Sequence, residues 1–422
     1  MISQSPYIDV IAICLIILVS YFFGIIAKRT NIPSVLLLIL LGVGIQFGLK
    51  AIEIPISNNL FDMLQLLGIV GLIMIVLEAA LDLKLTKEKK TLIWKSFFIA
   101  LLALLGSSFT IAWIINRYII DDFFTSLIYA VPLSIMSSAI ILPSVGKLAE
   151  GKKEFMIYES TFSDILGIML FYFLIEDSSY KNTAQIITDV TLNIILTVSL
   201  SVIVSYFLVL LFQRIEDKAK LFLLISVLIM LYAIGKQFLH LSSLVVILIF
   251  GLILNNHTLF FRGRIKKWIK KDILNNIIED LHIVTLESAF VVRTFFFVVF
   301  GISLDLLSLL DVETALISLA IVASLYIVRF IALKAFAMKS ILPELFVAPR
   351  GLITVLLFFS IPAHYVQEQF KSGILLYSIL LTGIIMTTAM VLKSDETDYV
   401  AELNFDDWEE LDEEVNQQFP RT

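Results

Sequence analysis

The sequence has little charge and almost no cysteine. Charged residues make up 16% of its 422 positions, and its single cysteine is Cys14. One cysteine excludes a disulfide within the chain and a metal cluster held by several thiolates. Apolar residues make up 59% and the mean hydropathy is +0.96, which is more than the core of a soluble protein needs. Most of the chain is therefore expected to lie in lipid.

Signatures of catalysis and of cofactor binding are also missing. The four histidines show no metal-ligand spacing with carboxylates, and the sequence has no nucleophile–base pair or phosphate-binding glycine loop. The net charge of −6 owes much to residues 393–422, so the rest of the chain is close to neutral. We therefore expect neither an enzyme, nor a resident metal or cofactor, nor a nucleic-acid partner.

Long apolar runs are abundant. Runs of roughly 17 to 30 residues between charged or Pro/Gly breaks are long enough to cross a bilayer as helices. We expect the first to be a retained span, because it lacks the cleavage site of a signal peptide. Thirteen spans are predicted: 6–27, 32–50, 60–83, 91–116, 123–147, 154–176, 185–213, 219–238, 240–256, 281–304, 313–338, 343–364 and 372–392.

The positions of lysine and arginine predict the orientation. Loops after odd-numbered spans hold 21 of them, and loops after even-numbered spans hold 5. Because basic residues near span ends stay in the cytoplasm, we expect a multi-pass protein of the cell (inner) membrane with its N-terminus outside. The basic amphipathic stretch 262–280 is expected either on the membrane surface or as a solvated connecting helix, and 393–422 as an acidic cytoplasmic tail.

Charges inside the spans are the most informative residues. A charge at bilayer depth costs at least roughly 2.5–3.5 kcal/mol, so retained charges are paired, hydrated or functional. The sixth span carries Glu159 and Asp164, about 7.5 Å apart along the helix axis. Arg329 in the eleventh span cannot lose its proton and must find an anion. We expect Arg329 to pair with Glu159, which leaves Asp164 able to exchange a proton for a cation.

The reverse pairing stays open at this point. If Asp164 is the partner of the arginine, Glu159 has to reach the cytoplasmic interface. Only the first arrangement leaves a carboxylate free for ion exchange. Partners of Glu287 and Arg293 are also open, because two residues six apart do not face each other on one helix.

Two predicted spans are interrupted. Proline removes a backbone hydrogen bond, so free carbonyls and amides appear at membrane depth, where they are tolerated only if they line a cavity. If six spans form a repeat that the seventh links to an inverted copy, the fifth and twelfth spans correspond, and matched breaks indicate a transporter's central site. Ordinary proline kinks are the alternative. The breaks contain Pro132, Ser137, Ser138 and Pro143 in the fifth span and Pro349, Arg350 and Gly351 in the twelfth.

Two further expectations concern these breaks. Arg350 is expected either to neutralise the C-terminal end of a half-helix or to anchor a span at its cytoplasmic end. Carbonyls near Ser137 and Ser138, together with Ser163, are expected to help Asp164 bind an ion. Glu78 and Asp82, at the end of the third span, are expected to be interfacial anchors.

Short stretches on successive spans, taken together, resemble a known family. They are 77–83 (LEAALDL), 137–143 (SSAIILP), 159–164 (ESTFSD), 295–305 (FFFVVFGISLD), Arg329 and 349–352 (PRGL). In this order they resemble the monovalent cation:proton antiporter superfamily, particularly its sodium/proton exchanger branch. By that resemblance Asp164 matches the ion- and proton-binding aspartate, Glu159 and Arg329 match the buried ion pair, and the broken spans match the crossing helices.

The resemblance also implies an architecture and an activity. The fold would be an all-α membrane domain, 1–392, that forms a homodimer. A core bundle, 91–176 and 313–392, would move like an elevator against a dimerisation scaffold, 6–83 and 219–304. The implied function is exchange of Na⁺ or K⁺ for H⁺ in pH homeostasis.

This sequence departs from the family pattern at two places. Ser163 stands where the exchanger branch usually has Asn, and Ser137-Ser138-Ala139 stand where a Thr-Asp pair is common. The second departure is similar to the potassium-efflux branch, so the choice between Na⁺ and K⁺ stays open. One exchanging acid favours one-for-one, electroneutral exchange.

Two other classes of function remain possible on the sequence alone. A gated cation channel could use the same broken helices, although neither a potassium-filter signature nor an arginine-rich repeat is present. A membrane scaffold or sensor could act through the acidic tail, 393–422.

Overall fold

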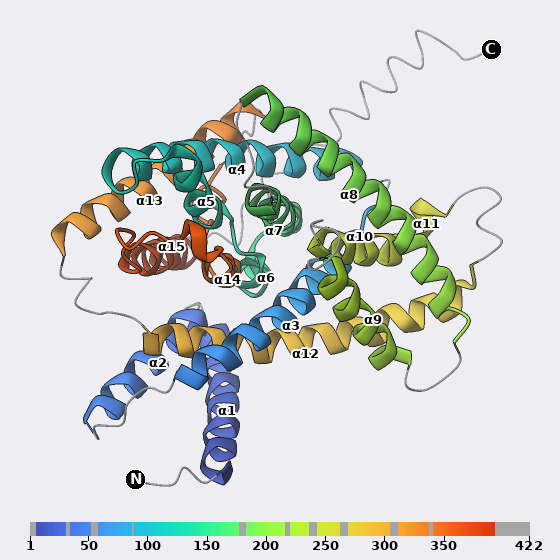
Figure 1. The fold of residues 1–422 in the computed structure, drawn as a ribbon, viewed down its shortest axis with the longest axis horizontal. Coiled ribbons are helices and arrows are strands. Elements are labelled where there is room, and N and C mark those ends of the chain that lie inside the picture. The colour runs from blue at the N-terminus through green and yellow to red at the C-terminus, as the bar shows by residue number, and fades with distance from the viewer. Residues whose placement is uncertain are drawn as a thin grey trace.

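The computed structural model describes residues 6–30, 34–51, 58–86, 88–176, 183–215, 220–235, 243–261, 269–303, 311–336 and 341–392. Regular secondary structure within these ranges is entirely helical (Figure 1). The acidic tail, the break expected at 237–240 and residues 262–268 of the basic stretch lie outside them.

The helices follow the apolar runs of the sequence. They are α1 (Pro6–Thr30), α2 (Ser34–Ala51), α3 (Asn58–Asp82), α4 (Lys90–Tyr118), α5 (Phe123–Ser134), α6 (Ser138–Ser144), α7 (Glu150–Glu176), α8 (Thr183–Phe212), α9 (Lys220–Ile234), α10 (Ser243–Asn255), α11 (His257–Phe260), α12 (Lys271–Ser303), α13 (Val312–Ala335), α14 (Leu352–Phe359) and α15 (Gly373–Leu392).

Several of these helices can cross a membrane. Within the described ranges, seven are long and apolar enough to do so, and four further apolar segments, 13–26, 196–212, 221–234 and 244–255, are shorter. The predicted all-helical, multi-pass membrane fold is therefore confirmed. The count of thirteen spans stays a prediction.

Two predicted spans have different ends in the structure. α12 begins ten residues before the predicted span 281–304, because apolar residues at 273, 274, 277 and 278 continue one helix face. The segment 343–364 was predicted as a helix broken in its middle, but turns occupy 342–346, 347–351 are not helical, and α14 begins only at Leu352. Pro343 and Pro349 account for this difference, because proline disfavours helical conformation in the residue before it.

The helices form two packed groups (Figure 1). In the first, α4 packs against α5, α7 and α13, and the group also includes α6, α14 and α15. In the second, α12 packs against α2 and α3, and the group also includes α1, α9 and α10, with the long α8 lying on α10. Contacts of α7 with α3 and α10, and of α14 with α12, join the groups.

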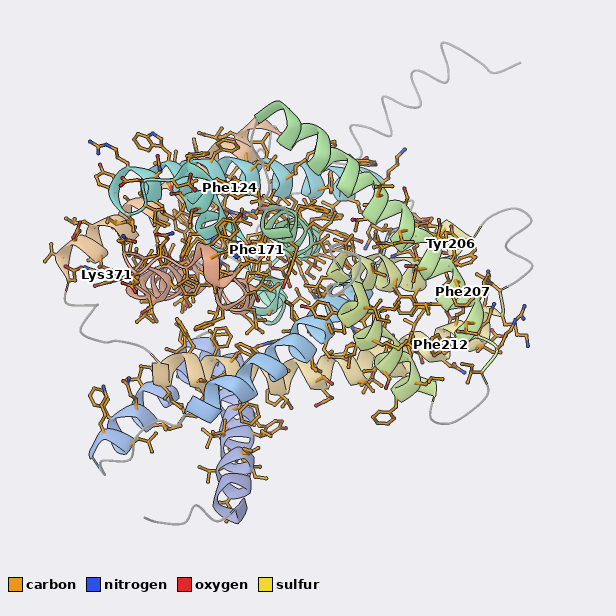
Figure 2. The ribbon with its side chains drawn as sticks, in the orientation of Figure 1. Phe124, Phe171, Tyr206, Phe207, Phe212 and Lys371 are labelled. Atoms are coloured by element: carbon orange, nitrogen blue, oxygen red, sulfur yellow. The ribbon has the colours of Figure 1, made fainter. Side chains whose placement is uncertain are left out.

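Apolar side chains fill the first group and also cover the outside of the protein. Figure 2 labels Phe171 of α7, which is fully buried among the helices, and Phe207 of α8, which is 62% exposed. Exposed phenylalanine and leucine side chains suit a lipid environment, whereas a soluble protein rarely exposes so many. The outer surface therefore fits a bilayer.

Glycines allow α2 and α12 to cross closely. A Cβ added to Gly42 would lie 2.1 Å from the Val298 carbonyl oxygen, and one added to Gly301 would lie 2.4 Å from the Ile39 carbonyl oxygen. Any side chain at either position would push the helices apart. The hydroxyls of Ser20 and Thr294, 2.6 Å apart, link α1 to the same helix.

Aspartates begin two helices of the first group. Asp122 accepts a hydrogen bond from the Thr125 backbone at the start of α5, and Asp311 does the same from Thr314 at the start of α13. Lys371 also donates to Asp311 at 2.6 Å. Hydrogen bonds from Lys371 and Thr314 lower the pKa of Asp311 to about 2.

Candidate functional site

Asp164 is a buried carboxylate in the middle of α7. The residue is 1% exposed. Oδ2 accepts a hydrogen bond of 3.1 Å from the backbone N–H of Ser138, the first residue of α6. Oδ1 has no hydrogen-bond partner among the described residues. One oxygen of this acid is therefore held in place, while the other is buried without a hydrogen-bond partner among the described residues.

The interruption between α5 and α6 faces α7. The helix ends at Ser134 and restarts at Ser138, as the Pro132 and polar-run pattern predicts. The Ser163 hydroxyl accepts a hydrogen bond of 3.0 Å from the Met136 backbone N–H within the gap. Ser163 therefore fixes the gap against α7, next to Asp164 in the sequence.

The two interruptions also touch each other. The Ser137 backbone N–H donates to the Pro349 carbonyl oxygen at 2.9 Å. A Cβ added to Gly351 would lie 2.6 Å from the Ser137 hydroxyl oxygen, so the backbones approach too closely for a side chain there. The Ser137 hydroxyl is buried and has no hydrogen-bond partner in the described ranges. The Ser137 carbonyl, which we expected to be free, accepts from Ile140 and Ile141.

Arg329 of α13 lies against Glu159 of α7. Nη1 is 2.6 Å from Oε1 and Nη2 is 3.0 Å from Oε2, so the guanidinium binds the carboxylate through both oxygens. The two side chains are 5% and 0% exposed. Arg329 also donates to the Glu344 carbonyl oxygen and to the Met136 sulfur. Asp164 is not the partner of this arginine.

Arg350 lies at the C-terminal end of α5. Its guanidinium donates to the carbonyl oxygens of Leu133 (2.9 Å), Ser134 (3.2 Å) and Ala348 (2.6 Å). The residue is 4% exposed, so it does not reach a membrane surface as an anchor would. It holds carbonyl groups that the end of α5 leaves without helical partners.

A small cavity adjoins the ion pair. It has a volume of about 20 Å³, which is room for about one water molecule. It lies between α4, α13 and the two interruptions. Its polar lining comes from Ser107, Ser134, Glu159, Ser163, Arg329 and Arg350.

Charged residues of the second group pair between α3 and α12, and sequence reasoning missed this. Arg293 of α12 lies 3.8 Å from the carboxylate of Glu78 on α3. His282 lies 2.8 Å from Asp82. Glu78 and Asp82, expected as interfacial anchors, thus pair with α12. The order of charges along separate helices gave no signal for these contacts.

The remaining sequence-predicted residues are placed as follows. Pro132 lies buried inside α5 and Pro349 is buried at the second interruption, while Pro143 belongs to α6. The exposed side chain of Glu287 forms no ion pair among the described residues. Ser138 binds Asp164 through its backbone N–H, whereas the backbone N–H of Ser137 binds the Pro349 carbonyl oxygen.

A multi-pass helical bundle with two interrupted segments crossing beside a buried acid is typical of a membrane transporter. The comparisons agree with this class: the transmembrane sodium/hydrogen exchanger family matches residues 15–393. The chain therefore belongs to the sodium/hydrogen exchanger family.

Solved structures show the same fold. The structure of the sodium proton antiporter MjNhaP1 from Methanocaldococcus jannaschii at pH 8 superimposes with a TM-score of 0.67 at 17% identity, covering 92% of this chain and 96% of that one. The electron-microscopy map of the same antiporter gives a TM-score of 0.62 at 18% identity, covering 93% and 96%. No curated protein matches this chain by sequence.

Proposed function

We propose that this protein is a secondary active transporter that exchanges a monovalent cation, Na⁺ or K⁺, for H⁺ at Asp164. The observation that supports this most is that Oδ1 of a fully buried carboxylate, beside two crossing interruptions, has no hydrogen-bond partner among the described residues. A desolvated carboxylate without a fixed counter-charge is stable only when a positive species neutralises it. A proton and a cation therefore compete for one site.

The neighbouring groups have separate roles in this proposal. Ser163 and Ser137 lie at the gap beside Asp164, where a cation would need additional oxygen ligands. Glu159 and Arg329 neutralise each other and keep a fixed geometry. Arg350 holds the end of α5, so the gap keeps its shape while the carboxylate changes its ligand.

Transport requires the site to open to each side in turn. We infer that the first group of helices moves as one body, like an elevator, against the second, and that only the neutralised carboxylate crosses. One exchanging acid gives one cation per proton, which is electroneutral. The fold similarity to a structure named as a sodium proton antiporter supports this proposal, which extends to a homodimer in the cell (inner) membrane with its N-terminus outside.

The test is proton movement in liposomes. Purified protein is reconstituted with a pH-sensitive dye inside, and Na⁺, K⁺ or Li⁺ is added outside. We expect a cation-dependent change of internal pH that persists when a permeant anion collapses the membrane potential. Asp164→Asn, which keeps the shape but cannot ionise, should reduce the change to the level of empty liposomes.

A matched variant controls for loss of an aspartate as such. Asp121→Asn changes an exposed residue between α4 and α5, and it should leave exchange unchanged. Full exchange by Asp164→Asn would refute the proposal. A rate that depends on the membrane potential would refute electroneutrality alone.

A further inference from the structure

Glu344 is a buried carboxylate away from the exchanging acid. It lies in the turns of 342–346, and its side chain is 1% exposed. Nζ of Lys152, in the first turn of α7, lies 2.9 Å from Oε1, and its hydrogen bond is directed to Oε2 at 3.1 Å. The same nitrogen donates to the Leu342 carbonyl oxygen at 2.7 Å. The lysine side chain is 23% exposed. The carboxylate of this pair is therefore shielded from the surroundings, and only the lysine is partly accessible.

The backbone of Glu344 is held as well. Nε and Nη2 of Arg329 donate to its carbonyl oxygen at 3.1 and 2.8 Å. The side chain is therefore fixed to α7 and the backbone to α13. These are the helices that carry Glu159 and Arg329, so residue 344 is a third point of attachment for the same rigid unit.

A short path leads from Glu344 to the ion site. Five residues further along the chain, the Pro349 carbonyl accepts the hydrogen bond from Ser137. The next amide, that of Ser138, donates to Oδ2 of Asp164. A shift of the turns at 342–346 would move the Pro349 carbonyl. Through its hydrogen bond with Ser137, this movement would reach the Ser138 amide that donates to Asp164.

We propose that Lys152 and Glu344 are positioning residues that hold the second interruption at the geometry needed for cation binding to Asp164. This inference rests on the proposed exchange function, because it assigns these residues a purpose within that site. Neither residue touches the transported ion. Their ion pair keeps residues 342–351 fixed to α7, so that both interruptions keep their positions relative to the exchanging acid.

The burial of the pair predicts an asymmetry between its members. Removing Lys152 leaves a dry carboxylate without a counter-charge, which is strongly unfavourable. Removing the charge of Glu344 leaves a lysine that can extend into water. Lys152→Met should therefore be more damaging than Glu344→Gln, and the double variant Lys152→Met/Glu344→Gln should be less damaging than Lys152→Met.

The experiment measures cation affinity in two ways. The first is the apparent KM for the cation in the liposome assay, and the second is the cation-induced rise in melting temperature of the detergent-solubilised protein. For Glu344→Gln we expect a roughly tenfold higher apparent KM, and roughly tenfold more cation for the same rise in melting temperature. Tenfold is the lower end of the loss of affinity seen when a residue that orients ion ligands is replaced. The rate at saturating cation should stay within about twofold of the parent, since Asp164 and its ligands are intact.

Lys153→Met is the matched control, because it removes a neighbouring lysine whose charge has no part in this pair. It should behave like the parent. If the parent neither exchanges ions nor gains stability from a cation, the proposed function fails. If the parent does both and Glu344→Gln lowers the melting temperature while its cation titration matches that of the parent, the positioning role is overturned and the pair is only structural.

Discussion

Arg329 fixes three parts of the chain with one buried side chain. Its guanidinium reaches Glu159 on α7, the backbone of Glu344 and the sulfur of Met136 in the first interruption. A planar group with five donors can make these contacts at once, whereas the point charge of a lysine cannot. In the proposed function the ion pair organises the site without taking part in the exchange.

Replacing this arginine should unfold the site. In Arg329→Met the fully buried Glu159 loses its counter-charge, which should destabilise the protein by about 3–5 kcal/mol. The measurement is the melting temperature in detergent, with Arg117→Met, at the exposed end of α4, as the control. The double variant Arg329→Met/Glu159→Met should be more stable than Arg329→Met, and a double variant that is no more stable would contradict the uncompensated charge as the cause.

The rarity of charges within apolar runs was enough to select Asp164, Glu159 and Arg329 from the sequence. The same reasoning applies to Glu344, which lies in a predicted span, but Glu344 was not selected from the sequence and nothing in the sequence indicates its partner. Lys152 is 192 residues away, and in the sequence nothing distinguishes it from the other lysines of the predicted cytoplasmic loops. A contact over such a separation depends on how the helices fold back on each other, which the local pattern does not contain.

The crossing of the two interruptions depends on a missing side chain. Gly351 has φ of −159°, which any residue can adopt, so its requirement is one of space and not of backbone strain. In Gly351→Ala the new Cβ would lie 2.6 Å from Oγ and 2.9 Å from Cβ of Ser137. The interruptions must then separate, at a cost of about 1–3 kcal/mol.

We expect Gly351→Ala to lower exchange by roughly tenfold or more, because a cost of about 1.4 kcal/mol at the site already corresponds to a tenfold loss. Gly146→Ala is the control, since a Cβ there would have nothing within 4 Å. The liposome assay compares both variants with the parent. Equal activity of the two variants would show that the crossing tolerates a methyl group.

Proline, glycine and polar runs were sufficient to locate both interruptions. They did not reveal that turns at 342–346, and not a half-helix, precede the second interruption. Residues 342–346 are apolar enough to read as half of a span, but Pro343 and Pro349 disfavour helix on both sides, and the ion pair of Glu344 and the hydrogen bonds of Arg329 hold the turns. Those contacts are tertiary, so the sequence pattern predicted a helix.

At the scale of the whole molecule, the sequence indicated the spans and an orientation but not which helix packs on which. Lipid-facing and buried faces of α2 or α10 are both apolar, so periodicity does not distinguish them. The contact of α12 with α2 and α3, and of α8 with α10, therefore emerges only in the structure. The division into a core bundle and a scaffold came from the family resemblance.

Movement of one group against the other can be tested with two disulfides in a Cys14→Ser background. Gly383 of α15 belongs to the first group, and a Cβ there would lie 3.5 Å from a methyl carbon of Leu36 on α2, in the second. Leu36→Cys/Gly383→Cys should therefore join the groups. Ser20→Cys/Thr294→Cys should join α1 to α12 within the second group, where the two hydroxyl oxygens are 2.6 Å apart.

If the first group moves as a body, oxidation of the first pair should stop exchange and reduction should restore it. Oxidation of the second pair should leave exchange unchanged, because α1 and α12 keep their contact throughout the cycle. The liposome assay, with the cross-linked fraction measured in the same sample, decides between the outcomes. Unchanged exchange after complete cross-linking of Leu36→Cys/Gly383→Cys would exclude a rigid-body motion at this contact and would require the site to open by local movement of α5, α6 and α14.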